Sequence, residues 1–216
     1  MFSKFDYFFI DNNTGGNMRR ITILAVVAFS LVTGNAMAES INGRLGLTGK
    51  LGFTVPLKDL EIGGAEIGEH NTGFVGGGGL IYGLGDNFAL ELDVTHAPAT
   101  DIKVGGAKVA EQQTTNISLG LQHRIMPEKR LVPYIGAGAD FIKGDITNST
   151  IDWAYGGHAS AGLDYFITKS IVATADFRFV AGSKSDIMLN NTTIGRYDPM
   201  SFIGTFGVRL FLPKNW

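Results

Sequence analysis

The sequence predicts an all-β protein: an eight-stranded antiparallel up-and-down transmembrane β-barrel with short periplasmic turns and long extracellular loops. Three observations predict this fold class. An export signal precedes residue 39, apolar and polar residues alternate in segments of about ten residues, and the polar face of these segments carries many charges. Together they place the apolar face of each strand against lipid.

The N-terminus has the pattern of a secretory signal peptide. A basic start at Met18 is followed by an apolar run over residues 21–32 and by an Ala-x-Ala cleavage site that ends at Ala38. The run is too short to span a bilayer as a helix. We therefore expect translation to begin at Met18, an N-terminal extension and signal peptide over 1–38, and a barrel over 39–216.

Eight segments after residue 38 show the period of two that is typical of membrane strands. Because no apolar stretch there reaches the roughly 18 residues of a membrane helix, any membrane span must consist of strands that close into a barrel. The predicted strands cover 44–55, 74–84, 88–95, 115–125, 131–141, 155–165, 171–179 and 202–212.

The connections between these segments alternate in length. The short ones are at 85–87, 126–130 and 166–170. The long ones are at about 56–72, 97–113, 143–152 and 181–198. Outer-membrane barrels have short periplasmic turns and long outer loops, so both ends of the barrel chain are expected to face the periplasm.

The polar face of the predicted strands is assigned to the lumen. It carries charges of both signs, and each Lys or Arg on the lipid face near the midplane would cost roughly 2–4 kcal/mol. We predict a lumen ion-pair network of Arg44, Glu91, Arg124, Asp164, Asp176, Arg178 and Arg209. Such a network can serve barrel stability alone. An eight-stranded barrel has room for side chains or one small ligand, so a water-filled porin is not expected.

The outer half of the lumen differs in character. Val75, Val180 and Ile203 point inward near the outer end, and Trp153 lies at the same level. The long loops also carry apolar residues, and exposed apolar patches usually mark a contact. Two interpretations stay open: these four residues line a passage for a small hydrophobic molecule, or the loops pack on one another above the barrel.

Several motifs resemble those of the OmpW family of small outer-membrane barrels. They are residues 130–141 (RLVPYIGAGADF), 153–167 (WAYGGHASAGLDYFI), 86–92 (DNFALEL) and 197–202 (YDPMSF). Their order and spacing extend over most of residues 42–212. The resemblance implies an eight-stranded barrel in the outer membrane of a Gram-negative bacterium. It also implies a narrow, largely apolar passage that takes up small hydrophobic molecules, with lateral release into the membrane as one route.

Two other functions were weighed. Long outer loops suit a structural or surface-recognition barrel, of adhesin or phage-receptor type, without transport. His158-Ala159-Ser160 resembles the His-x-Ser of outer-membrane lipid A deacylases, which would make His158 and Ser160 a hydrolase pair. The strand period puts both side chains on the lumen face, whereas those deacylases act at the lipid-facing surface. We therefore expect that the protein is not an enzyme.

Composition argues against further classes. The chain has no cysteine, which excludes disulfides and thiolate metal sites, and its net charge of −2 does not predict a nucleic-acid partner. His70, His96 and His123 lack metal-ligand spacing, and the glycine clusters lack the ending of a phosphate loop. We expect no metal, no cofactor and no nucleic acid, and outer-membrane lipids as the partner; the oligomeric state is not predicted.

Overall fold

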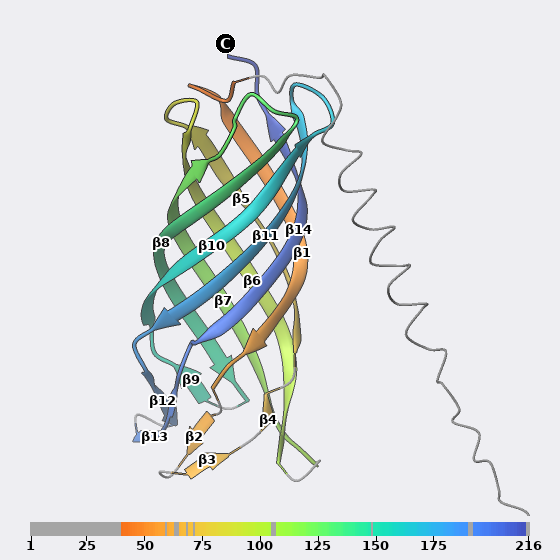
Figure 1. Cartoon of the computed structure of the whole chain (residues 1–216). Helices are drawn as coiled ribbons and strands as arrows, with labels where there is room; N and C mark the ends of the chain where they lie inside the picture. Colours follow the sequence, from red (N-terminus) through yellow and green to blue (C-terminus); the bar gives the residue numbers. More distant parts are fainter. Residues whose placement is uncertain are drawn as a thin grey trace, which may run out of the picture. The chain divides into compact units, whose positions relative to one another are not determined.

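The computed structural model describes residues 40–214 except 59, 63–64, 68, 71, 105–106, 148 and 190–191. The predicted extension and signal peptide over 1–38 lie outside the described residues. Within the described part, eight strands form a closed antiparallel barrel (Figure 1), which confirms the predicted fold class. The wall strands are β1 (Leu45–Pro56), β5 (Gly73–Gly83), β6 (Phe88–Val104), β7 (Ala107–Arg124), β8 (Leu131–Ile146), β10 (Ala154–Phe166), β11 (Ile171–Gly182) and β14 (Ser201–Phe211).

The barrel closes because each wall strand pairs with the next along the chain and the last pairs with the first. In the β1–β14 ladder Leu47 lies opposite Leu210, and in the β1–β5 ladder Leu47 lies opposite Leu80. These three leucines are outward-facing and exposed. A closed ladder satisfies the backbone polar groups that lipid cannot. Among the described residues, no helix is long and apolar enough to cross a membrane.

The two ends of the barrel differ. Tight connections and the C-terminus lie at one end, and the six short strands lie at the other (Figure 1). These strands are β2 (Leu60–Ile62), β3 (Ala65–Ile67), β4 (Glu69–His70), β9 (Ser149–Ile151), β12 (Ser185–Leu189) and β13 (Thr192–Tyr197). By the usual arrangement of such barrels, the end with tight turns is periplasmic and the other is extracellular.

The extracellular segments are more ordered than the sequence predicts. The expected loops at 56–72, 97–113, 143–152 and 181–198 all contain strand residues, and β6 and β7 continue as a hairpin paired as far as Val104 and Ala107. The physical reason is that the alternation of apolar and polar residues is imposed by lipid. Beyond the membrane a strand no longer needs an apolar face, so its sequence reads as a loop.

Burial in the barrel is the reverse of that in a water-soluble protein. Many large apolar side chains are exposed on the outer face; Phe206 is 60% exposed and Leu51 is 59% exposed. By contrast, Arg209 is 1% exposed and Asp164 is fully buried. Charged residues are almost never buried unless they are paired, so the outer face fits lipid and the lumen must hold ion pairs.

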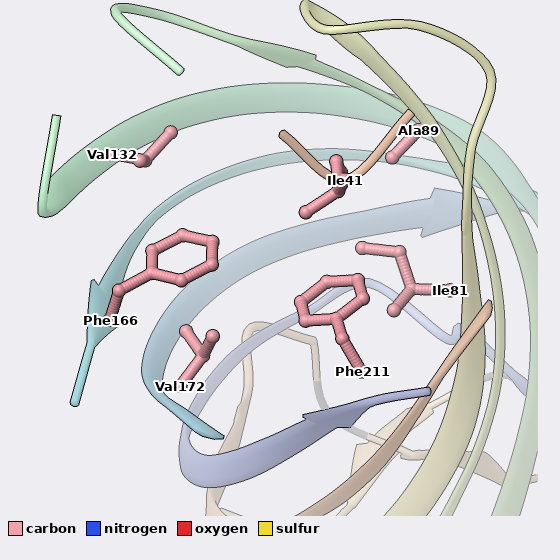
Figure 2. Packing of buried hydrophobic residues seen from close by; sticks show 7 residues of the cluster. All are labelled: Ile41, Ile81, Ala89, Val132, Phe166, Val172 and Phe211. Carbon is pink, nitrogen blue, oxygen red and sulfur yellow. The ribbon is translucent and has the colours of Figure 1, made fainter. Parts of the chain in front are cut away.

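An apolar plug closes the lumen at the periplasmic end. Figure 2 shows its side chains converging across the barrel: Ile41, Ile81, Ala89, Val132, Phe166, Val172 and Phe211. The rings of Phe166 and Phe211 are stacked, with centroids 6.3 Å apart and planes 9° from parallel. Beside them, the buried Arg44 guanidinium donates hydrogen bonds to the carbonyls of Lys169 and Leu212, at 2.9 and 3.1 Å.

Candidate functional site

On the extracellular side of the apolar plug, buried charged side chains cross the lumen. We call them the ion-pair layer. Arg209 on β14 lies 2.7 Å from the Glu91 carboxylate on β6 and 3.2 Å from that of Asp164 on β10. Asp164 also accepts a 2.7 Å hydrogen bond from Arg124 on β7. Gln122 donates to Glu91 at 2.6 Å. The contacts therefore join strands on different sides of the barrel.

A second group continues the ion-pair layer toward the outside. Arg178 on β11 pairs with Asp93 on β6 at 2.9 Å and donates to the Ser118 hydroxyl on β7 at 2.7 Å. Lys50 on β1 reaches the same Asp93 carboxylate at 2.5 Å. Asp176 on β11 also accepts a 2.9 Å hydrogen bond from Tyr134 on β8, so seven strands meet through the ion-pair layer.

The residues of the predicted lumen network fall into two places. Glu91, Arg124, Asp164, Asp176, Arg178 and Arg209 are buried in the ion-pair layer. Arg44 is also buried and inward-facing, but the hydrogen bonds described for it are with the backbone and Ser170 at the apolar plug. Because Arg44 precedes the first strand, it lies at the barrel end, where it donates to the carbonyls of Lys169, Phe211 and Leu212.

A histidine and two polar partners form the outermost part of the charged lumen. His158 Nδ1 lies 2.7 Å from one Asp140 oxygen, and the Asn116 amide donates to the other at 2.8 Å. The imidazole ring occupies space left by glycines: a Cβ at Gly138 would lie 2.7 Å from its Cε1 atom. Asn116 also lines a cavity at the extracellular end of the lumen, and His158, Asp140 and Asn116 together form the floor of that cavity.

The outer cavity opens at the extracellular end of the lumen and has a volume of about 80 Å³. One wall is apolar and consists mainly of Val75, Ile142, Val180 and Ile203. The polar wall, on the adjacent strands β6 and β7, is uncharged and consists of Thr95, Gln112, Thr114 and Asn116. Asp198, Pro199 and Met200 complete the mouth. Such a site suits a small molecule with an apolar body.

Tyr197, at the end of β13, covers one side of the mouth. It packs against the buried cluster of Ile142, Ala154 and Val180. Burial raises the pKa of Tyr197 to about 12, although a hydrogen bond with Thr114 acts in the opposite direction. The phenol is therefore neutral at physiological pH and fixes the extracellular strand β13 to the barrel wall.

The four residues predicted to line a passage are divided by the structure. Val75, Val180 and Ile203 line the outer cavity. Trp153 does not, and its prediction as a lining residue is wrong: it is 44% exposed, and Lys143 Nζ lies 5.6 Å from its ring centroid on the outer surface. The strand period gives the reason, since Trp153 has the same parity as the outward-facing Tyr155.

His158 and Ser160 both face the lumen and are buried. Within the described residues no hydrogen bond joins them, and the Ser160 hydroxyl instead lies beside Gly136, where a Cβ would be 2.7 Å away. The carboxylate that His158 contacts is that of Asp140, which Asn116 shares. In the part of the chain that the structure describes, no cluster of three acidic or histidine residues could hold a metal ion.

The polar wall of the outer cavity was not identified from sequence. Gln112 fell in an expected loop and Thr114 just outside the expected strand, although both continue the inward parity of Asn116 on β7. Tyr197 also fell in an expected loop. The parity of β7, extended outward past residue 115, was the signal that could have found Gln112 and Thr114.

The barrel wall beside the outer cavity has an interrupted seam. The β5–β6 ladder runs from Gly83 opposite Ala89 to Gly76 opposite His96, and within the described residues no pairing joins Gly73–Val75 to β6. Immediately beyond His96 the β6–β7 register shifts between Ala97 and Thr100, a stretch that includes a proline, which has no N–H to donate. Gly73, Val75 and Ala97 all line the outer cavity.

Comparisons with known proteins agree with this architecture. Outer membrane protein OprG from Pseudomonas aeruginosa is 16% identical, with a TM-score of 0.58 over 80% of this chain and 99% of that chain. Neisserial surface protein A is 16% identical, with a TM-score of 0.53 over 78% and 97%. Outer membrane protein W of E. coli is 14% identical, with a TM-score of 0.51 over 79% and 98%. These likenesses concern the fold.

Sequence comparison gives the family. No curated protein matches the chain by sequence. A family model described as an outer membrane protein beta-barrel domain matches residues 24–209. The chain therefore belongs to the outer membrane protein beta-barrel domain family, and its barrel lies in an outer membrane.

Proposed function

We propose that this barrel is an OmpW-like uptake protein of a Gram-negative outer membrane, which admits small, largely apolar molecules from the extracellular side. The observation that carries the proposal is the outer cavity, whose apolar wall of Val75, Ile142, Val180 and Ile203 opens outward at the end of an otherwise filled lumen. Apolar lining with a few polar groups is the usual character of small-molecule sites.

The proposed route leaves the lumen sideways rather than along the barrel axis. The ion-pair layer and the apolar plug lie between the cavity and the periplasmic end of the lumen. Opening both would expose buried charges at a cost of several kcal/mol. The interrupted β5–β6 seam supports a lateral exit, because among the described residues no ladder pairing joins Gly73–Val75 to β6 at the level of the cavity, before pairing with β6 resumes at Glu69 and His70 on β4. An apolar molecule that leaves through this seam enters the hydrocarbon directly.

The test is uptake of a small hydrophobic probe by cells that lack the gene. The wild-type barrel should restore uptake, and Val180→Arg/Ile203→Arg, which places two charges in the apolar wall, should abolish it. Gln113→Arg, at an exposed polar position on the outer face of β7, is the matched control for an added charge outside the cavity. Uptake that is unchanged by the wild-type barrel, although the barrel is present in the membrane, would refute the proposal.

A second candidate is surface recognition without transport. It is favoured by the sheet that extends above the barrel, in which β9, β12, β13 and β2 pair in succession beyond β8. A filled lumen also suits a barrel whose task is to present such a surface. If the uptake test fails, this function becomes the better account.

We propose no catalytic role for His158 and Ser160. A serine nucleophile needs a base within hydrogen-bond reach, and the contact of His158 is with Asp140 and not with Ser160. Both side chains also face the lumen, away from the lipid substrate that a lipid A hydrolase would need.

A further inference from the structure

The polar wall of the outer cavity contains two amide side chains whose oxygens have no donor. The Asn116 Oδ1 and Gln112 Oε1 atoms are buried, and among the described residues no group donates a hydrogen bond to either of them. Both side chains line the cavity and lie on the inner face of β7, four residues apart. Asn116 as a whole is only 7% exposed. A buried acceptor without a donor is costly, and each such group calls for an explanation.

The orientation of the Asn116 amide follows from its neighbours. The Asn116 side chain faces the Asp140 carboxylate, which can only accept, so the NH₂ group must point there and leave the oxygen free. His158 contacts the other Asp140 oxygen, and this fixes Asp140 as the acceptor for both neighbours. The Gln112 amide likewise donates to the Thr114 hydroxyl at 3.5 Å. Both donor groups are therefore directed away from a ligand, and both acceptors remain.

Two acidic side chains lie near these acceptors, and His158 contacts one of them. Among the described residues that line the cavity, the charged one is Asp198, at the mouth. Below the floor, Asp140 lies directly behind Asn116. A carboxylate ligand would bring no donor to the two oxygens and would meet two negative charges.

We infer that the outer cavity selects molecules with an apolar body and an O–H or N–H donor, and that it discriminates against carboxylates and against molecules without a donor. The inference rests on the proposed function and adds the class of ligand. The donor binds Asn116 Oδ1 or Gln112 Oε1, and the apolar body lies against Val75, Val180 and Ile203.

The test uses three probes of matched shape: cyclohexanol, its methyl ether and cyclohexanecarboxylate. Dissociation constants are measured by NMR titration of the refolded barrel in lipid nanodiscs, with empty nanodiscs to correct for partition into lipid. The alcohol should bind about five- to tenfold more tightly than the ether, as expected for one hydrogen bond to a buried acceptor, and more tightly still than the carboxylate.

Variants locate the effect. Asn116→Leu/Gln112→Leu, which removes both acceptors, should lower the affinity for the alcohol to that for the ether and leave the ether unchanged, and Asn116→Leu alone should lower the affinity for the alcohol in part. Gln112→Leu removes the second oxygen without touching Asp140, and provides the same comparison if Asn116→Leu does not fold. Asp140→Asn should raise the affinity for the carboxylate. Gln113→Leu, on the outer face of the same strand, is the control and should change none of the three affinities.

The outcomes separate this inference from the function on which it rests. Equal affinities for alcohol and ether in the wild type would overturn the donor requirement and leave the cavity as a binding site. The same conclusion follows if neither Asn116→Leu nor Gln112→Leu lowers the affinity for the alcohol. If no probe binds, both the inference and the proposed cavity function are overturned.

Discussion

Arg209 is the residue on which the interior of this barrel most depends. It is 1% exposed, contacts the carboxylates of Glu91 and Asp164, and its guanidinium lies 5.4 Å from the ring centroid of Tyr134. A buried charge of this kind is tolerated only because its partners are held in place by other strands. Its contribution is therefore to join β14 with β6 and β10 across the lumen.

Removing the Arg209 charge should destabilise the barrel strongly. We expect Arg209→Met to lower the free energy of unfolding by about 3 kcal/mol or more, because Glu91 and Asp164 lose a buried partner. Urea unfolding in lipid vesicles, followed by tryptophan fluorescence, measures this. Arg196→Met is the control, since Arg196 is 63% exposed in its pair with Asp186 and should cost less than about 1 kcal/mol. Equal effects of the two variants would contradict the role given to Arg209.

Which face a residue occupies could be predicted from parity, but its partner could not. The alternation assigns Arg209 to the lumen, yet it does not say that Glu91, more than a hundred positions away, lies across from it. Parity also marks Phe211 as inward, because Leu210 and Leu212 are outward, but parity does not show that inward apolar side chains at the strand ends converge as a plug. Parity applied without exception would have excluded Trp153 from the lumen.

On β10, an inward-facing glycine makes room for a side chain that crosses the lumen. Tyr134 on β8 crosses to Asp176 on β11 and passes over β10 at Gly162, where a Cβ would lie 2.3 Å from the phenol oxygen. A larger residue at this position must displace the tyrosine. The glycine therefore makes the cross-lumen hydrogen bond between β8 and β11 possible.

This arrangement predicts a contrast between two glycines. Gly162→Ala should lower the free energy of unfolding by about 1–3 kcal/mol, since the added methyl group overlaps Tyr134. Gly49→Ala on β1 should have little effect, because nothing lies within 4 Å of the added atom. The same urea titration in lipid vesicles compares them. A neutral Gly162→Ala would mean that Tyr134 moves freely and that its contact with Asp176 is unimportant.

The lengths of the strands were predictable only within the membrane. β6 and β7 extend to Val104 and Ala107, well past the expected strand ends at residues 95 and 115. Lipid imposes the period of two, and the hairpin beyond it is stabilised by backbone pairing, which the side-chain pattern does not reveal. Gln112 and Thr114, which belong to the polar wall of the outer cavity, lie in this region, so the sequence pattern did not identify them.

At the scale of the whole molecule, the lumen consists of three successive parts. The apolar plug closes the periplasmic end, the ion-pair layer fills the middle, and the outer cavity opens outward. The sequence supplied the wall, the direction of the strands and the charged interior. The cavity and the interrupted β5–β6 seam arise from strand closure and register, and both needed the three-dimensional structure.

The most direct measurement locks the seam and follows uptake of the hydrophobic probe. The chain has no cysteine of its own, so Val75→Cys/Ala97→Cys can join β5 to β6 by a disulfide. Thr54→Cys/Gly73→Cys is the control, placed on opposed residues of the paired β1–β5 ladder at the same cavity. Oxidation should stop uptake in the first variant alone, and reduction should restore it. Uptake that continues through a fully cross-linked β5–β6 seam would contradict lateral release.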